Sequence, residues 1–256
     1  MANTLKEKMK RGEKVIGTFT HIGGNVAVEL LGLAGLDFVV IDTEHAPFSN
    51  QSVMDYVIAS EVRGITPVVR VADHTRASLH RPINSGAKSL IIPCMETVAE
   101  AKLLSEQCKF YPTGRHCFPY SRNSSWGRDS AGRLTDFFDE QNDDILIMPQ
   151  CETVGFLDNL EEILAMKAID GVFVGPFDLS TDMGVPGQFG DPKMVAAREK
   201  ILRCCKEAGK FAWIFSPNAE AGKQNLADGF DGTAISMDTV VYADAFKKMV
   251  ADVHGK

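Results

Sequence analysis

The sequence predicts an α/β protein, and within that class a (β/α)8 barrel of the TIM type. Three observations predict this fold. Eight short apolar runs are each followed by a helical pattern, the chain has 256 residues, and no linker divides it. Eight strand–helix units in roughly 250 residues are typical of this barrel, so we expect one domain over residues 1–256. A doubly wound open sheet is the alternative, but the first strand lacks a glycine-rich phosphate turn before its helix.

Composition and charge narrow the class of protein. Charged residues make up 24% and hydrophobic residues 45% of the chain, as in ordinary globular domains. The net charge of −7 argues against a general nucleic-acid surface. The charged N-terminus is not a signal peptide, and no apolar run approaches the roughly 20 residues that span a bilayer. Because the six cysteines show no Cys-x-x-Cys pair, we expect reduced thiols in a cytoplasmic protein.

In the first half of the chain, an opening helix with Leu5 and Met9 on one face precedes four strand–helix units. The run from Phe38 to Ile41 is continuously apolar, as in strands buried on both faces of a parallel sheet. The expected strands are 15–20, 38–41, 66–70 and 89–93, and the expected helices are 26–33, 52–62, 76–83 and 97–107.

A long segment at about 108–142, containing glycine, serine and aromatic residues, interrupts the pattern. Such segments are usually functional lids or disordered, and the aromatic residues favour a packed loop with some helix at its end. The expected strands that follow are 145–148, 171–174, 211–215 and 232–235, and the expected helices are 156–164, 194–208, 219–227 and 240–253.

Polar residues follow several of the expected strands, at the positions where barrel enzymes carry their working residues. Glu152 and Asp178 follow the fifth and sixth strands. Because parallel strands of one βαβ unit end side by side, these two carboxylates should lie near one point. Two hard oxygen ligands suit a divalent metal ion. The polar residues at strand ends are His21, Asp42, His45, Arg70, Gln150, Glu152, Asp178 and Ser216.

Five motifs occur in a characteristic order along almost the whole chain. They are Ile-Asp-Thr-Glu-His-Ala-Pro at 41–47, Pro-Val-Val-Arg at 67–70, Gly-Ala at 86–87, Pro-Gln-Cys-Glu-Thr at 149–153 and Gly-Val-Phe-Val-Gly-Pro-Phe-Asp-Leu-Ser at 171–180. Together they resemble the HpcH/HpaI family of class II pyruvate aldolases. That family has a (β/α)8 barrel of the phosphoenolpyruvate/pyruvate-domain type, which agrees with the independent strand count.

The resemblance implies a carbon–carbon lyase of the aldehyde-lyase type. It would reversibly cleave a 4-hydroxy-2-oxo acid into pyruvate, or a related 2-oxo acid, and an aldehyde through a metal-stabilised enolate. By the same resemblance, Glu152 and Asp178 would bind Mg²⁺, Mn²⁺ or Co²⁺. Gly175 and the backbone amides of Phe177 and Asp178 would hold the substrate carboxylate, and Gln150 would line the site.

The resemblance also assigns the chemistry to two further residues. Arg70 would stabilise the charge on the keto oxygen while His45, directly or through a metal-bound water, removes the C3 proton. The structural alternative for Arg70 is a salt bridge to Asp42 or Glu44. Cys151, between two site residues of its strand, should point away and serve packing.

Two departures from the family pattern concern the base and the acceptor. Asn84 stands where many members have an aspartate that forms a dyad with the histidine, so we expect a less basic His45 and slower proton transfer. Trp213 and Phe215 replace smaller residues on the seventh strand. We expect them to shape the acceptor pocket and to favour small aldehydes over long diacid semialdehydes.

Alternative functions follow from the same residues. A Schiff-base aldolase would need a lysine at a strand's C-terminal end, whereas Lys88 precedes its strand. The same enolate site could decarboxylate oxaloacetate, and a non-catalytic 2-oxo-acid binding protein is the alternative from another class.

Residues outside these motifs carry weaker expectations. Four residues of the long segment could contact an anionic substrate or be solvated, namely Arg115, His116, Arg122 and Arg128. His74, His80 and His254 should lie on the surface. We expect no nucleic-acid or membrane partner. By the resemblance, the protein is a homo-oligomer, commonly a hexamer built from dimers that exchange the last helix.

Overall fold

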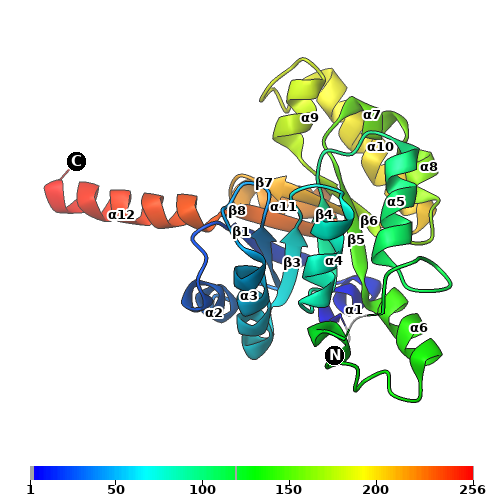
Figure 1. Cartoon of the computed structure of the whole chain (residues 1–256). Helices are drawn as coiled ribbons and strands as arrows, with labels where there is room; N and C mark the ends of the chain where they lie inside the picture. Colours follow the sequence, from blue (N-terminus) through cyan, green and yellow to red (C-terminus); the bar gives the residue numbers. More distant parts are fainter. Residues whose placement is uncertain (1–2, 119, 256) are drawn as a thin grey trace.

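Eight parallel strands form a closed barrel in the computed structural model, which describes residues 3–118 and 120–255 (Figure 1). Each strand pairs with the next in the sequence, and β1 pairs with β8. This confirms the predicted (β/α)8 fold; residues 1, 2, 119 and 256 of the expected domain lie outside the described residues. The strands are β1 (Val15–Thr20), β2 (Phe38–Asp42), β3 (Thr66–Arg70), β4 (Ser89–Ile92), β5 (Leu146–Cys151), β6 (Gly171–Val174), β7 (Phe211–Ser216) and β8 (Gly232–Met237).

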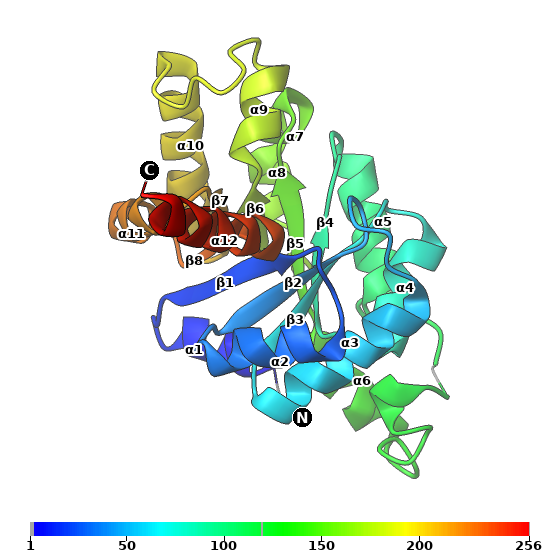
Figure 2. The ribbon, with the colours of Figure 1, turned by 90° about the vertical axis from the view of Figure 1, so that its left-hand side faces the viewer.

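Helices follow the strands and cover the outside of the barrel over most of its circumference (Figures 1 and 2). They are α1 (Thr4–Lys10), α2 (Asn25–Leu33), α3 (Asn50–Arg63), α4 (Arg76–Asn84), α5 (Val98–Cys108), the 3₁₀ turn η1 (Arg122–Ser124), α6 (Leu134–Asp144), α7 (Val154–Asp158), α8 (Leu160–Leu164), α9 (Pro176–Asp182), α10 (Pro192–Ala208), α11 (Ala219–Asp228) and α12 (Asp238–His254).

The strands are apolar throughout because both of their faces are buried. In β2 every residue is buried, and alternate side chains point to opposite faces of the sheet. Phe38 and Val40 face the barrel interior, and Ile41 packs in the layer between the sheet and the helices. This burial explains why the expected strands read as continuous apolar runs.

The N-terminal end of the barrel is closed by α1. Leu5 and Met9 of this helix pack into the interior cluster beneath the strands. There the ring of Trp213 stacks on Phe38 with a centroid separation of 4.6 Å, and its indole N–H points at the sulfur of Met9, 3.0 Å away. The interior is therefore filled at this end, and the C-terminal end is the one that can admit a substrate.

Two segments differ from the expected elements. The helix expected at 156–164 is broken into α7 and α8 at Asn159, whose side-chain amide donates to the carbonyls of Glu96 and Gly155. The long segment at about 108–142 contains η1 and α6, and its aromatic residues pack together, as Phe110 and Phe138 do at 5.2 Å. This segment is therefore packed, as its composition indicated.

The last helix, α12, projects away from the barrel (Figures 1 and 2). None of its described residues is buried, although it carries many apolar side chains. In the part of the chain that the structure describes, no helix has the length and apolarity needed to cross a membrane.

Candidate active site

The C-terminal ends of four strands bring the predicted polar residues together. Asp42 and Arg70 are the last residues of β2 and β3 and are direct partners in the sheet register. Glu152 follows β5, and Asp178 lies in the first turn of α9, which begins just after β6. The predicted convergence of these side chains at one end of the barrel follows directly from the parallel topology.

Asp42 holds Arg70 through two parallel hydrogen bonds. The Nε and Nη2 groups of Arg70 donate to Oδ1 and Oδ2 of Asp42 at 2.9 Å and 2.7 Å, and both side chains are buried. Burial by itself raises the pKa of Asp42, but the bonds and the charge of Arg70 outweigh it and lower that pKa. Asp42 is therefore an anion that fixes the plane of the guanidinium group.

Arg70 keeps donors for a substrate. Its Nη1 atom lies 3.1 Å from Oε2 of Glu44, an ion pair without the alignment of a hydrogen bond. Of the five N–H donors of an arginine, the two bonds to Asp42 leave those on Nη1 available. The salt bridge considered as a structural alternative is thus present, and it orients Arg70 without saturating it.

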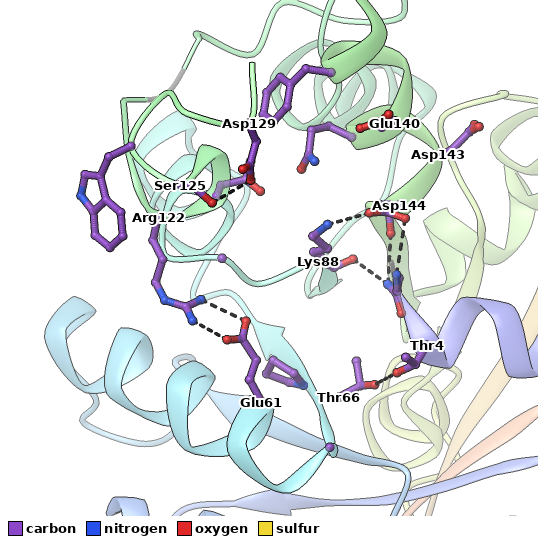
Figure 3. Close-up of a pocket in the computed structure, with 18 of the residues that line it drawn as sticks. Thr4, Glu61, Thr66, Lys88, Arg122, Ser125, Asp129, Glu140, Asp143 and Asp144 are labelled. Carbon is purple, nitrogen blue, oxygen red and sulfur yellow. Dashed lines mark hydrogen bonds and ion pairs between the residues drawn. The ribbon is translucent and has the colours of Figure 1, made fainter. Parts of the chain in front are cut away.

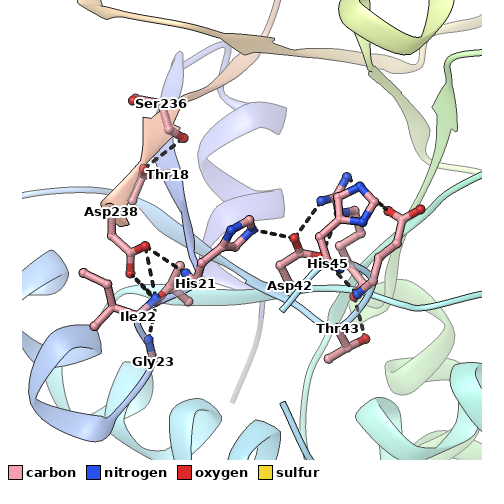
Figure 4. Close-up of polar contacts among 12 residues, drawn as sticks. Thr18, His21, Ile22, Gly23, Asp42, Thr43, His45, Ser236 and Asp238 are labelled. Atoms are coloured by element: carbon pink, nitrogen blue, oxygen red, sulfur yellow. Dashed lines mark hydrogen bonds and ion pairs between the residues drawn. The ribbon is translucent and has the colours of Figure 1, made fainter. Parts of the chain in front are cut away.

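Two histidines, His21 and His45, lie on either side of Asp42 (Figure 4). His45 lies on the rim with 60% of its side chain exposed, and its Nε2 atom is 4.0 Å from Oε2 of Glu44. His21, at the end of β1, places its Nε2 atom 2.6 Å from Oδ2 of Asp42. His45 is therefore accessible to a bound substrate, whereas His21 contacts the carboxylate that positions Arg70.

Glu152 is a buried carboxylate among other carboxylates. Its Oε1 accepts a 2.6 Å hydrogen bond from the backbone amide of Cys94, and its Oε2 contacts the amide of Gln150. Burial raises the pKa of Glu152, and the charges of Asp178 and Glu44 raise it further. The negative charge gathered here exceeds what the neighbouring donors neutralise.

This cluster fits a hard divalent cation. The side-chain oxygen of Gln150 is buried without a hydrogen-bond partner, beside the crowded carboxylates of Glu152 and Asp178. A Cβ atom on Gly175 would lie 3.0 Å from Oε2 of Glu152, so glycine keeps this space open. Within the described residues no three His, Cys, Asp or Glu side chains gather around one point. Glu152 and Asp178 would therefore supply only two carboxylate ligands, and water or substrate would supply the rest, as is usual for Mg²⁺.

Cys94 belongs to the site, although it was not among the predicted residues. It follows β4 with a positive φ of 55°, a backbone conformation that lets its amide reach Glu152. Burial, followed by the charge of Glu152, raises the pKa of its thiol to about 11, so the thiol stays protonated. Its position directly after the fourth strand was the available signal. Cys151, as predicted, is buried in the layer between the sheet and the helices.

The expected contact between Asn84 and His45 is absent within this chain. Asn84 ends α4, which leads into the first residue of β4 at the N-terminal end of the barrel, whereas His45 follows the C-terminal end of β2. The amide of Asn84 instead lies 3.3 Å from Nε2 of His116. The prediction that Asn84 influences the basicity of His45 is therefore wrong for contacts within one chain.

The two aromatic residues of β7 have different positions. Trp213 is buried in the closed N-terminal end, so its predicted role at the acceptor pocket is wrong. Phe215, two residues further along the strand, lies near the open end and contacts Phe19 and Phe177 edge-on at 5.9 Å and 6.1 Å. Phe177 is half-exposed and packs on Phe189, so an aromatic wall borders the site at Phe215.

Several residues predicted with less specificity lie away from this site. A cavity of about 710 Å³ lies outside the barrel, beside the starts of β3 and β4 and among α3, η1 and α6 (Figure 3). Arg122 pairs there with Glu61, and Lys88 lies 2.6 Å from Asp144. Arg122 is thus remote from the substrate end, and Lys88 precedes β4, as predicted.

His80 is buried, contrary to the prediction of a surface position. Its ring lies 4.1 Å from that of His116, centroid to centroid, and its Nε2 atom is 3.0 Å from the side-chain oxygen of Gln107. Burial lowers the pKa of both histidines, that of His116 to about 4. His116 is therefore a neutral packing residue rather than an anion-binding one.

Comparison with known proteins assigns the chain to a family. Residues 16–245 match the family described as HpcH/HpaI aldolase/citrate lyase. The chain belongs to this family. The 2-keto-3-deoxy-L-rhamnonate aldolase of Shigella boydii serotype 4 is 31% identical over 253 residues, covering 98% of this chain and 93% of that protein. Its counterpart in Escherichia coli K12 is 30% identical with the same coverage.

Solved structures agree with the family assignment. The crystal structure of an HpcH/HpaI aldolase from Desulfitobacterium hafniense DCB-2 has a TM-score of 0.90 at 27% identity, covering 97% of this chain and 96% of that one. An HpcH/HpaI aldolase/citrate lyase family protein from Burkholderia cenocepacia J2315 has a TM-score of 0.89 at 28% identity, covering 98% and 99%. The prediction of an aldolase-type lyase on a (β/α)8 barrel is confirmed.

Proposed function

We propose that this protein is a metal-dependent class II aldolase that reversibly cleaves a 4-hydroxy-2-oxo acid into pyruvate and a short aldehyde. The observation that carries the proposal is the pair of carboxylates Glu152 and Asp178 at the same end of the barrel as a single positioned arginine, Arg70. A 2-oxo acid, which carries a carboxylate and a keto oxygen, complements a site that combines a cation with a guanidinium group.

Glu152 and Asp178 are the residues that would hold the ion, which we take to be Mg²⁺, Mn²⁺ or Co²⁺. When bound, such an ion polarises the keto group and stabilises negative charge that develops on its oxygen. Gln150 and Gly175 shape the space beside it. The backbone amides of Phe177 and Asp178 lie in the first turn of α9, where helix geometry leaves them without intrahelical partners for a substrate carboxylate.

Arg70 and His45 carry the proton chemistry in this proposal. Nη1 of Arg70 donates to the keto oxygen, so that charge can accumulate there as the C3 proton leaves. His45, exposed on the rim, accepts that proton, and in the cleavage direction it accepts the proton of the C4 hydroxyl. Glu44, partly buried between Arg70 and His45, orients the imidazole electrostatically.

The acceptor aldehyde is a short one in this proposal. Phe215, Phe177 and Phe189 form an aromatic wall at the open end of β6 and β7, and this wall limits the length of the second substrate. Aldolases acting on 2-keto-3-deoxy-L-rhamnonate are among the similar proteins. A sugar-derived 2-keto-3-deoxy acid, which releases pyruvate and a three-carbon hydroxyaldehyde, is therefore the substrate class that we propose.

Assembly is part of the proposal. The exposed apolar side chains of α12 are Val240, Val241, Tyr242, Phe246, Met249, Val250 and Val253. Apolar side chains are also exposed on α2, among them Val26, Leu30 and Leu33. We infer that two copies exchange α12 and that such dimers build a hexamer, and we place the enzyme in the cytoplasm, where its six free thiols stay reduced.

The test is exchange of the methyl protons of pyruvate in deuterated water, followed by NMR with and without Mg²⁺ or Mn²⁺. Exchange requires enolisation, so we expect metal-dependent exchange that chelation abolishes. A panel of aldehydes then identifies the acceptor, with lactaldehyde and glyceraldehyde expected to exceed succinic semialdehyde. A 2-oxo-acid binding protein would show no exchange, and equal rates with succinic semialdehyde would contradict a short acceptor. Release of CO₂ from oxaloacetate without aldol cleavage would favour the decarboxylase.

A further inference from the structure

His21 donates a hydrogen bond to the carboxylate that positions Arg70 (Figure 4). Its Nε2 atom lies 2.6 Å from Oδ2 of Asp42. The side chain of His21 is largely buried, and that of Asp42 is fully buried. Because the pKa of Asp42 is lowered, chiefly by Arg70 against the effect of burial, this carboxylate is ionised and can only accept. The proton of this contact is therefore on Nε2 of His21.

Asp42 is the junction of three parts of the site. Its Oδ2 accepts from His21 and from Nη2 of Arg70, and its Oδ1 accepts from Nε of Arg70 at 2.9 Å. Oδ1 also accepts from the backbone amides of Glu44 at 3.1 Å and His45 at 3.4 Å. The orientation of this one carboxylate therefore sets the plane of Arg70 and the start of the segment that carries His45.

The donor itself is held rigidly. The backbone amide of His21 donates to Oδ1 of Asp238 at 2.8 Å, and the hydroxyl of Thr20 donates to Oδ2 of Asp238 at 2.6 Å. The imidazole also packs edge-on to the ring of Phe19, 6.5 Å from centroid to centroid. That same Phe19 ring lies 4.8 Å from the guanidinium carbon of Arg70. His21 and Arg70 therefore contact both a common ring and a common carboxylate.

We propose that His21 is a positioning residue for the aldol reaction, acting through Asp42 on Arg70. Its Nε2–H donor holds the Asp42 carboxylate in the orientation that binds Nε and Nη2 of Arg70 together, which leaves Nη1 for the keto oxygen. This role rests on the proposed function. Because Arg70 acts on charge that develops as the proton leaves, loss of the donor lowers the rate of enolisation more than it weakens substrate binding.

The experiment compares two amide variants of His21 in the full-length protein. His21→Gln places an amide donor where Nε2 was, whereas the shorter His21→Asn does not reach Asp42. With Mg²⁺ and pyruvate in deuterated water, we expect His21→Asn to reduce kcat for exchange roughly tenfold, the scale of one lost hydrogen bond to a charged group. KM for pyruvate should change less than about twofold, and His21→Gln should keep most of the parental kcat. His254→Asn, at the exposed chain end, is the control and should match the parent.

Each outcome decides the role of His21. Equal exchange rates in His21→Asn and His21→Gln, whether both normal or both reduced, would overturn it, since only one keeps the donor. A raised KM with unchanged kcat in His21→Asn would overturn it as well, because His21 would then bind substrate directly.

If thermal unfolding shows that His21→Asn is not folded, His21→Phe, which keeps a ring but lacks the donor, takes its place with the same expectations. Absence of exchange in the parental protein overturns the aldolase proposal and this role together, whereas normal exchange in the parent and in His21→Asn overturns this role alone.

Discussion

The two ends of the barrel handle polar groups in opposite ways. At the N-terminal end they are paired and the interior is filled: Lys88 lies 2.6 Å from Asp144, and Trp213 stacks on Phe38. At the C-terminal end, Glu152 has a raised pKa because it is buried near Asp178 and Glu44 without enough positive charge.

The difference separates stability from chemistry. Closely packed and paired groups stabilise the folded state, whereas crowded like charges oppose folding until a ligand neutralises them. Substitutions at the two ends should therefore have opposite effects on stability and activity, and three experiments test this.

The largest effect should come from Trp213→Ala at the closed end. Removing this fully buried ring leaves a cavity beside Phe38 and Met9, so the free energy of unfolding should fall by about 3–5 kcal/mol. Urea denaturation measures the change. Trp126→Ala removes the other tryptophan, which is 66% exposed, and should change stability by less than about 0.5 kcal/mol. A change in aldehyde preference in a folded Trp213→Phe variant would contradict the position that we assign to this residue.

Glu152→Gln, at the open end, should lower activity without lowering stability. Because the pKa of Glu152 is raised in the folded protein, its charge opposes folding at neutral pH, and the metal-free variant should be at least as stable as the parent. Metal-dependent exchange should fall about 10²–10³-fold, the range for losing one group that supports developing charge. Urea denaturation of the metal-free proteins and the exchange assay measure the two effects. Glu162→Gln, on the exposed surface of α8, is the matched control and should match the parent. A Glu152→Gln variant with parental exchange would contradict a metal site at Glu152.

A smaller and pH-dependent effect should come from His116. Its pKa is lowered from 6.5 to about 4, first by burial, so the unfolded chain binds a proton between these values and the folded protein does not. This contribution to stability is complete above about pH 6.5 and is lost as the pH falls toward 4, by up to about 1.4 kcal/mol per pH unit.

The neutral variant His116→Gln should show a shallower decline of unfolding free energy between pH 6.5 and 4.5, measured by urea denaturation at each pH. His254→Gln, at the exposed end of α12, is the control and should decline as the parent does. An unchanged slope in His116→Gln would show that the buried imidazole pair is not the acid-sensitive element.

The sequence was sufficient for the barrel and for half of the site. Apolar runs buried on both faces define the strands, and parallel topology brings Glu152, Asp178 and Arg70 to one end whatever the details of packing. These residues were predictable because their positions depend only on where strands end.

The remaining site residues depend on geometry that the sequence does not carry. Cys94 contributes a backbone amide to the site through a positive φ. Outside the site, the His80–His116 pair was missed for the same reason, since it joins segments that are distant in the sequence. The errors at Asn84 and Trp213 have a simpler cause. A motif match assigned their roles without regard to their position along the barrel axis, although Asn84 is the last residue of α4 and Trp213 is the third residue of β7.

The position of Asp238 links the terminal helix to catalysis. It is the first residue of α12, and its carboxylate accepts from Thr20 and from the backbone amides of His21 and Ile22. If a second copy supports α12, as we propose, Asp238 would link that support to the turn at His21, and His21 contacts Asp42. Dilution that separates the copies would loosen this turn, and specific activity would then follow the association equilibrium by mass action.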